Sequence, residues 1–217
     1  MRGVFVTGTG TEVGKTVVAA VIARSAAAAG QAVGVFKPAV TGLDEAGEPD
    51  HRLLRRAAGS AQEDEELAPY RYGPPMSPHL AADLAGEAIE PARVAAAARA
   101  AGAGRFLIAE GVGGLLVPLA GGYLVRDLAR DLGLPAVIAA PPGLGTINHT
   151  LLTLEAARAA GLDVAAVVLT PWPAEPGPIE ESNLATIASL GAVRVETLRR
   201  IDVGRPAGWP DLRIGVF

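Results

Sequence analysis

The chain has 217 residues, of which 50% are hydrophobic and only 4% aromatic, and its formal net charge is −4. This length suits one domain, the apolar content excludes a disordered chain, and scattered arginines in an acidic chain argue against nucleic-acid binding. The absence of cysteine excludes disulfides and thiolate metal sites, and three widely spaced histidines form no metal-binding motif.

Short apolar runs alternate with longer, alanine-rich stretches along the chain. In order, they predict strand Gly3–Thr7, helix Gly14–Ala29, strand Val33–Phe36, helix Asp50–Ala58, helix Pro91–Ala101, strand Phe106–Ala109, strand Ala136–Ala140, helix Thr146–Ala160, strand Val164–Leu169, helix Ile179–Leu190 and a last short strand Ile214–Val216. Continuous apolar strands between helices are typical of a parallel sheet covered on both faces. The sequence thus predicts a single α/β domain over residues 1–217, with a doubly wound, mostly parallel sheet of the P-loop NTPase type.

The N-terminal residues enter the first predicted strand directly, without a signal-peptide hydrophobic region. No apolar run reaches the roughly eighteen residues of a membrane span. We therefore expect a soluble, cytoplasmic protein that binds neither membrane nor nucleic acid.

The strongest motif lies between the first predicted strand and helix, where residues 8–16 are Gly-Thr-Gly-Thr-Glu-Val-Gly-Lys-Thr. A P-loop requires this context, because backbone N–H groups and the helix N-terminus surround the phosphates. Lys15 would neutralise phosphate oxygens, and Thr16 would ligate Mg²⁺. Five residues rather than the usual four separate Gly8 from Gly14, so a glycine-rich turn without a ligand is the alternative.

Three further charged residues are candidates for the site, two of them at the ends of predicted strands. Glu110 follows the strand Phe106–Ala109 and is the candidate acidic partner for the P-loop metal, with strand capping as the alternative. Asp50 is a second candidate metal ligand, although an N-cap is its more ordinary role. Lys37 is ordinarily a surface charge, but it becomes a catalytic candidate because other polar segments also follow strand ends, namely Lys15, Thr41, Gly143–Asn148 and Thr170.

Together these motifs resemble the dethiobiotin synthetase family over nearly the whole chain. The similar segments are Thr7–Thr16, Lys37-Pro38, Thr41-Gly42, Asp50, Ser77-Pro78-His79, Glu110–Gly114 and Leu144–Thr153. A P-loop alone is shared by many ATPases, whereas this combination in this order is specific. The last forty residues resemble the family only weakly.

The resemblance implies an ATP-dependent cyclo-ligase of biotin biosynthesis, which joins CO₂ to 7,8-diaminononanoate and closes the ring of dethiobiotin through a carbamate and a carbamic-phosphoric anhydride. Lys37 would be the main catalytic residue, with Lys15, and Thr16, Asp50 and Glu110 would hold Mg²⁺. The diamine would contact Thr11, Lys37 and Thr41. The nucleotide would contact Glu12, Val13, Gly14, Lys15, Thr16, Val17, Asp50, Glu110, Gly111, Val112, Gly113, Thr170, Pro171, Thr197, Leu198 and Arg199.

A homodimer is also implied, with the substrate carboxylate bound at the start of a helix of the partner subunit. A helix N-terminus favours a carboxylate, because its N–H groups are free and its dipole end is positive. We expect His149 to be a packing residue of this helix. The residues that would bind the carboxylate are Leu144, Gly145, Thr146, Ile147 and Asn148.

One departure from the family pattern concerns the nucleotide base. The family commonly carries an Asn after the fifth strand whose amide contacts adenine, whereas here Thr170-Pro171 follow. A single hydroxyl cannot match the donor and the acceptor of an amide, so we predict that CTP or GTP replaces ATP at comparable rates. Near Thr197–Arg199, the family's usual Pro is also missing.

Two other classes share this kind of sheet. Switch ATPases of the partitioning and cell-division type, the alternative function, carry an extra lysine near the start of the P-loop, which residues 8–11 lack. Amide-forming synthases acting on corrin rings need a glutaminase domain with a nucleophilic cysteine, for which this chain has neither the length nor the residue.

Overall fold

The structure, a computed structural model, describes residues 1–215. Its centre is a six-stranded sheet in the order β2-β3-β1-β6-β7-β8, in which every neighbouring pair is parallel. The strands are β1 (Arg2–Gly8), β2 (Val33–Phe36), β3 (Phe106–Glu110), β6 (Ala136–Ala140), β7 (Val164–Trp172) and β8 (Val195–Arg199). A separate antiparallel pair consists of β4 (Pro118–Ala120) and β5 (Tyr123–Leu124).

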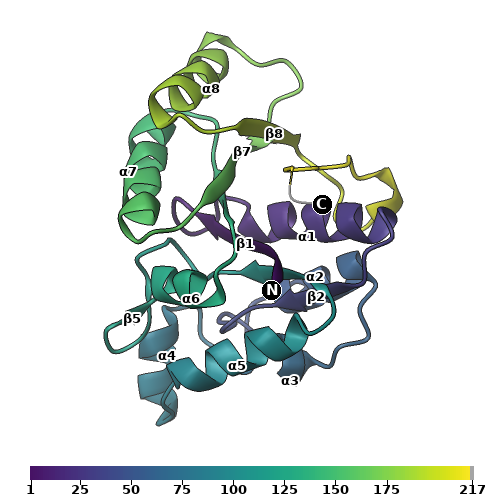
Figure 1. Cartoon of the computed structure of the whole chain (residues 1–217), viewed down its shortest axis with the longest axis vertical. Helices are drawn as coiled ribbons and strands as arrows, with labels where there is room; N and C mark the ends of the chain where they lie inside the picture. Colours follow the sequence, from purple (N-terminus) through teal and green to yellow (C-terminus); the bar gives the residue numbers. More distant parts are fainter. Residues whose placement is uncertain (216–217) are drawn as a thin grey trace.

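Helices cover both faces of the sheet (Figure 1). They are α1 (Lys15–Ala28), α2 (Asp50–Ala58), α3 (Asp64–Leu67), α4 (Pro78–Ala85), α5 (Pro91–Ala101), α6 (Val125–Leu132), α7 (Thr146–Ala159) and α8 (Pro178–Gly191), with a 3₁₀ turn at Pro206–Gly208. No helix within residues 1–215 is long and apolar enough to cross a membrane.

Successive residues of each strand point to opposite faces, which divides the core in two. Val4 and Val6 of β1 pack with α1 and α2 on one face, whereas Phe5 packs with α5 and α6 on the other. On β6 and β7 the second face is covered by α7 and α8. Because both faces are covered, the strands are apolar at almost every position, which is why their sequence signal was continuous rather than alternating.

The doubly wound, mostly parallel fold is confirmed, and the first five predicted strands and all five predicted helices are present. The prediction of a last strand at Ile214–Val216 is wrong at Ile214, which lies outside any strand and packs in the core with Trp209 and Leu212; Val216 lies outside the described residues. The sixth place belongs to β8, whose sequence Val-Glu-Thr-Leu-Arg contains no apolar run. Helix α6 was also missed, although Val125, Leu128, Ala129 and Leu132 follow helical spacing.

Candidate active site

A cavity of about 770 Å³ opens beyond the carboxyl ends of β1, β2 and β3. Its walls come from the P-loop, the loop between β2 and α2, the start of α4 and the turn after β3. The structure brings together here twelve of the site residues expected from the sequence: Thr11, Glu12, Gly14, Lys15, Thr16, Val17, Lys37, Thr41, Asp50, Glu110, Val112 and Gly113. Gly42, Ser77 and Pro78, which belong to the similar segments, line the cavity too. The sequence gave no signal for other lining residues, which are Val40, Leu43, Glu45, Ala46, Gly47, Glu48, Pro49, Pro75, Met76 and Val117.

The P-loop wraps around the side chain of Lys15. The Lys15 ammonium donates a 2.7 Å hydrogen bond to the Gly10 carbonyl, and the side chain is buried. Gly14 precedes α1 in the left-handed conformation (φ 86°), and a Cβ there would lie 2.7 Å from the Thr170 methyl group. Only glycine meets both conditions without strain. The extra residue of this P-loop lies before Gly14, and α1 still begins directly after this glycine.

Lys37 lies between two carboxylates contributed by different elements. Its ammonium donates to Glu110 Oε1 at 2.9 Å and also to Asp50, the first residue of α2. The hydroxyl of Thr16 donates to the same Glu110 oxygen at 2.7 Å. The surface-charge alternative for Lys37 is therefore wrong, because its residue is only 4% exposed, and Asp50 is not an N-cap, because Pro49 holds that position.

Burial and charge oppose each other in this cluster. Burial acts to lower the pKa of Lys37, but the Glu110 and Asp50 carboxylates outweigh it and raise that pKa. Burial raises the pKa of Glu110 against the attraction of Lys37. Burial also lowers the pKa of Lys15. Lys15 and Lys37 are the only lysines in the sequence, so every ammonium side chain of the protein lies at this cavity.

The residues around Glu110 fit a magnesium ion. Glu110 Oε2 is buried and has no hydrogen-bond partner, which leaves one acceptor free for a cation or its bound water. Carboxylate and hydroxyl oxygens are the ligands that Mg²⁺ prefers, and Mg²⁺ usually binds through one or two carboxylates plus substrate phosphates. Within the described part of the chain, no group of three or more acidic or histidine side chains is arranged to hold a metal ion.

Two predicted nucleotide segments lie side by side but outside this cavity. Strands β7 and β8 pair Leu169 with Thr197 and Trp172 with Arg199, so Thr170-Pro171 and Thr197–Arg199 meet at one edge. Thr170 is 3% exposed and packs its methyl group toward Gly14. Leu198 packs in the core, so its side chain cannot contact a nucleotide; Thr197 and Arg199 are exposed. Val13 and Gly111 also lie behind the lining, packed toward the core and Val125 respectively.

The segment Leu144–Asn148 does not line the cavity of its own chain. Leu144 is 97% exposed, and Gly145 is the left-handed N-cap of α7, which no side chain caps. Thr146 is buried beside Thr150, whereas Asn148 is exposed. His149 is exposed as well, so the packing role expected for it is wrong. Asn183 of α8, which the sequence did not single out, donates to the carbonyls of Pro142 and Gly143 at 2.8 and 3.1 Å and fixes this turn.

Similarity to known proteins decides the family. The chain is 48% identical over 193 residues to the ATP-dependent dethiobiotin synthetase BioD of Anaeromyxobacter dehalogenans (strain 2CP-C), with 88% of this chain and 86% of that protein covered. The chain belongs to the dethiobiotin synthetase family. The dethiobiotin synthetase BioD of Bacillus velezensis (strain DSM 23117 / BGSC 10A6 / LMG 26770 / FZB42) is 39% identical over 197 residues, covering 90% of this chain and 84% of that protein.

Two further similarities agree with this family and its fold. A family model described as an AAA domain matches residues 2–198. A nucleotide-binding protein of Archaeoglobus fulgidus, solved in complex with ADP, superposes with a TM-score of 0.50 at 18% identity, covering 96% of this chain and 89% of that one. At this identity the likeness shows a shared fold and nothing finer.

Proposed function

We propose that this chain catalyses the ATP-dependent carboxylation and ring closure of 7,8-diaminononanoate to dethiobiotin in biotin biosynthesis. The observation that carries the proposal is the placement of Lys15, Lys37 and the Thr16–Asp50–Glu110 set around one cavity, in a chain 48% identical to a dethiobiotin synthetase. Such an enzyme is a cyclo-ligase and uses ATP as co-substrate.

The proposed reaction has three balanced steps. One amine of the substrate adds to CO₂ and loses a proton, which gives a carbamate. A carbamate oxygen then attacks the γ-phosphorus of ATP, ADP leaves, and a carbamic-phosphoric anhydride forms. The second amine attacks the carbonyl carbon, the C–O bond to phosphate breaks, and the cyclic urea forms with release of phosphate and a proton.

The difficulty in this chemistry is that an anionic carbamate must approach a polyanionic phosphate. Lys15 and Lys37 supply preorganised positive charge for that encounter. Thr16, Asp50 and Glu110 would hold Mg²⁺, which when bound neutralises charge on the phosphate oxygens. Lys37 stays protonated, because the Glu110 and Asp50 carboxylates raise its pKa. Their hydrogen bonds also fix the direction of its ammonium group.

Thr11 and Thr41 lie on the cavity wall and would contact the two amines. Ring closure is then mainly a question of holding the second amine near the carbonyl, for which positioning alone gives a large acceleration. We assign the carboxylate end of the substrate to Leu144–Asn148 of a partner subunit in a homodimer. Support comes from the exposed Leu144 and the uncapped N-terminus of α7, which cannot serve the cavity of their own chain.

The alternative function, a switch ATPase, is not favoured. The relatives are named as dethiobiotin synthetases, and residues 8–16 of the P-loop contain no lysine besides Lys15.

The test is an incubation with 7,8-diaminononanoate, bicarbonate, Mg²⁺ and ATP, followed by mass detection of dethiobiotin and colorimetric detection of phosphate. We expect dethiobiotin and phosphate in equal amounts, and only when the diamine is present. Equal phosphate release without the diamine would instead favour the switch ATPase.

A further inference from the structure

Lys37 and Asp50 meet in the site, although a loop of twelve residues separates them in the chain. Lys37 directly follows β2, whereas Asp50 begins α2. The loop between them lines the cavity and contains Gly42 and Gly47, both at positive φ (80° and 128°). Backbone hydrogen bonds fix residues 40–44 of this loop against residues 70–74, and the contacts of α2 then decide where Asp50, at its start, lies.

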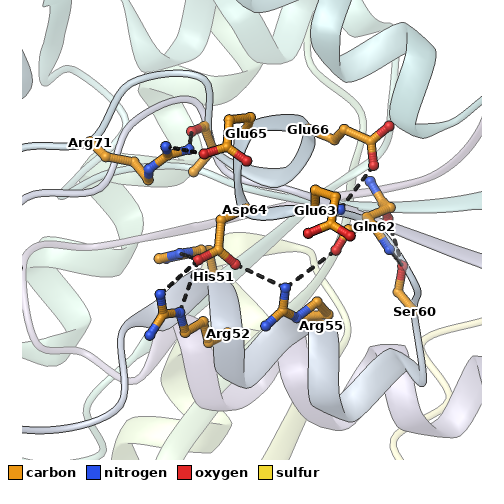
Figure 2. Close-up of polar contacts among 11 residues, drawn as sticks. His51, Arg52, Arg55, Ser60, Gln62, Glu63, Asp64, Glu65, Glu66 and Arg71 are labelled. Carbon is orange, nitrogen blue, oxygen red and sulfur yellow. Dashed lines mark hydrogen bonds and ion pairs between the residues drawn. The ribbon is translucent and has the colours of Figure 1, made fainter.

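Asp64, the first residue of the short helix α3, holds the first two turns of α2. Its Oδ2 accepts hydrogen bonds from Arg52 Nε and Nη2 at 3.0 and 2.8 Å, and its Oδ1 forms an ion pair with Arg55 Nη1 at 3.0 Å. The ring of His51, which is 2% exposed, lies 3.4 Å from the same carboxylate. Figure 2 shows all three side chains of α2 converging on Asp64.

The same segment is tied to the strand that carries Lys37. The amide of Lys37 donates to the Leu67 carbonyl, at the end of α3, at 2.8 Å. Val35 lies in β2, two residues before Lys37. The side chain of Gln62 accepts a hydrogen bond from the Val35 amide at 2.9 Å and donates one to the Val35 carbonyl at 3.2 Å. Strand β2 is an edge strand, and residues 62–67 occupy its free edge where another strand would pair. One brace therefore touches both β2 and α2.

We propose that Asp64 is a positioning residue that holds Asp50 at the distance from Lys37 and Glu110 needed to bind the metal of the nucleotide complex. Mg²⁺ demands near-ideal octahedral geometry, so a small displacement of one carboxylate weakens its binding. Partners that orient metal ligands from behind typically change metal affinity by about 10–100-fold when they are removed. This inference rests on the proposed metal role of Asp50, although it does not depend on the diamine substrate.

The experiment measures Mn²⁺ binding by EPR of the free ion, with the full-length protein and ADP. For Asp64→Asn, we expect the Kd for Mn²⁺ to rise about 10-fold or more, while the Kd for ADP without metal stays within about twofold. The matched control is Asp211→Asn, which removes the same charge from the exposed Arg24–Asp211 pair at 3.2 Å and should leave both constants unchanged. Circular dichroism checks that each variant is folded.

Arg52→Gln separates positioning from simple charge and also serves if Asp64→Asn does not fold. Removing the positive charge of Arg52, whose side chain is 53% exposed, would tighten cation binding if charge alone acted. Positioning predicts weaker Mn²⁺ binding in this variant as well. An unchanged Mn²⁺ affinity in folded Asp64→Asn, or tighter binding in Arg52→Gln, would overturn the inference. Failure of the wild-type protein to make dethiobiotin would contradict the proposed function alone.

Discussion

Lys37 illustrates how the site is decided residue by residue. A buried ammonium is costly unless it is paired, and here Glu110 and Asp50 supply two opposite charges within hydrogen-bonding distance. Glu110 in turn keeps one oxygen without a partner. The cluster therefore holds a cation close to a glutamate. Burying these charges costs free energy, which is consistent with a functional role for them.

Substitution of Lys37 tests its assignment as the main catalytic residue. We expect Lys37→Ala to lower the turnover of 7,8-diaminononanoate by about 10²–10³-fold, the range for losing one preorganised donor. Steady-state phosphate release with saturating substrates measures the effect. ADP binding confirms that the variant is folded, and turnover close to that of the wild type would contradict the assignment.

Thr170 leads to a prediction about the nucleotide base. The resemblance implies an amide where this chain has Thr170, a residue that is only 3% exposed, so we expect discrimination between bases to be weak. An amide–adenine pair contributes about 1–3 kcal/mol in nucleic-acid readers. We expect CTP and GTP to support dethiobiotin formation at rates comparable to ATP. Parallel rate measurements at equal nucleotide concentrations check this, and a strict preference for ATP would show that other groups select the base.

At the scale of elements, the C-terminal segment after β8 takes part in the core. Trp209, Leu212 and Ile214 pack against α1, and the Leu212 amide donates to Ser25 Oγ at 2.9 Å. The Trp209 indole donates to the Asp202 carbonyl at 2.7 Å. The C-terminal segment runs beside α1 (Figure 1), although it lies beyond residues 2–198, which the family model matches.

We therefore expect Trp209→Ala to lower the free energy of unfolding by about 3–5 kcal/mol, as for other large buried aromatics. Urea unfolding followed by circular dichroism measures the loss. Val203→Ala, at a 41% exposed position of the same segment, should change stability by less than about 0.5 kcal/mol. A loss below about 1 kcal/mol for Trp209→Ala would mean that the segment contributes little to the core.

At the scale of the whole molecule, the parallel sheet collects the strand ends β1, β2 and β3 at one cavity and leaves α7 on a different part of the surface. Leu144 (97% exposed) lies in the turn before α7, and Leu152 (56% exposed) lies on the helix itself. Exposed leucines beside an uncapped helix start suit contact with a second copy of the chain. The proposed dimer would unite this part of the surface with the cavity of the partner.

This arrangement predicts the effect of a charge on α7. We expect Leu152→Asp to convert a dimer of 22.0 kDa chains to monomer, measured by light scattering, and to lower turnover while ADP affinity stays within about twofold. The P-loop lies within one chain, so nucleotide binding does not need the partner. Leu84→Asp on α4, at a 70% exposed position, is the control; a wild-type monomer would contradict the dimer.

The sequence by itself determined the parts of this protein that depend on local patterns. Apolar runs predicted five of the strands, and the P-loop and Glu110 were recognised because each adjoins such a run. Strand ends of a parallel sheet meet at one edge, so even the proximity of Lys37 to Glu110, 73 residues apart, was predictable in outline.

Only the tertiary structure decided which side chains meet. Asp50 fits an N-cap pattern locally, but its carboxylate turns to Lys37, because strand order places that ammonium beside it. Three of the five residues of β8 are polar, so the sequence alone did not distinguish it from a loop, and its pairing with β7 makes it a strand. No sequence motif indicated the contacts between Asp64 and α2. The physical reason is that periodicity reports how one segment is buried, whereas ion pairs between segments depend on how the sheet stacks them.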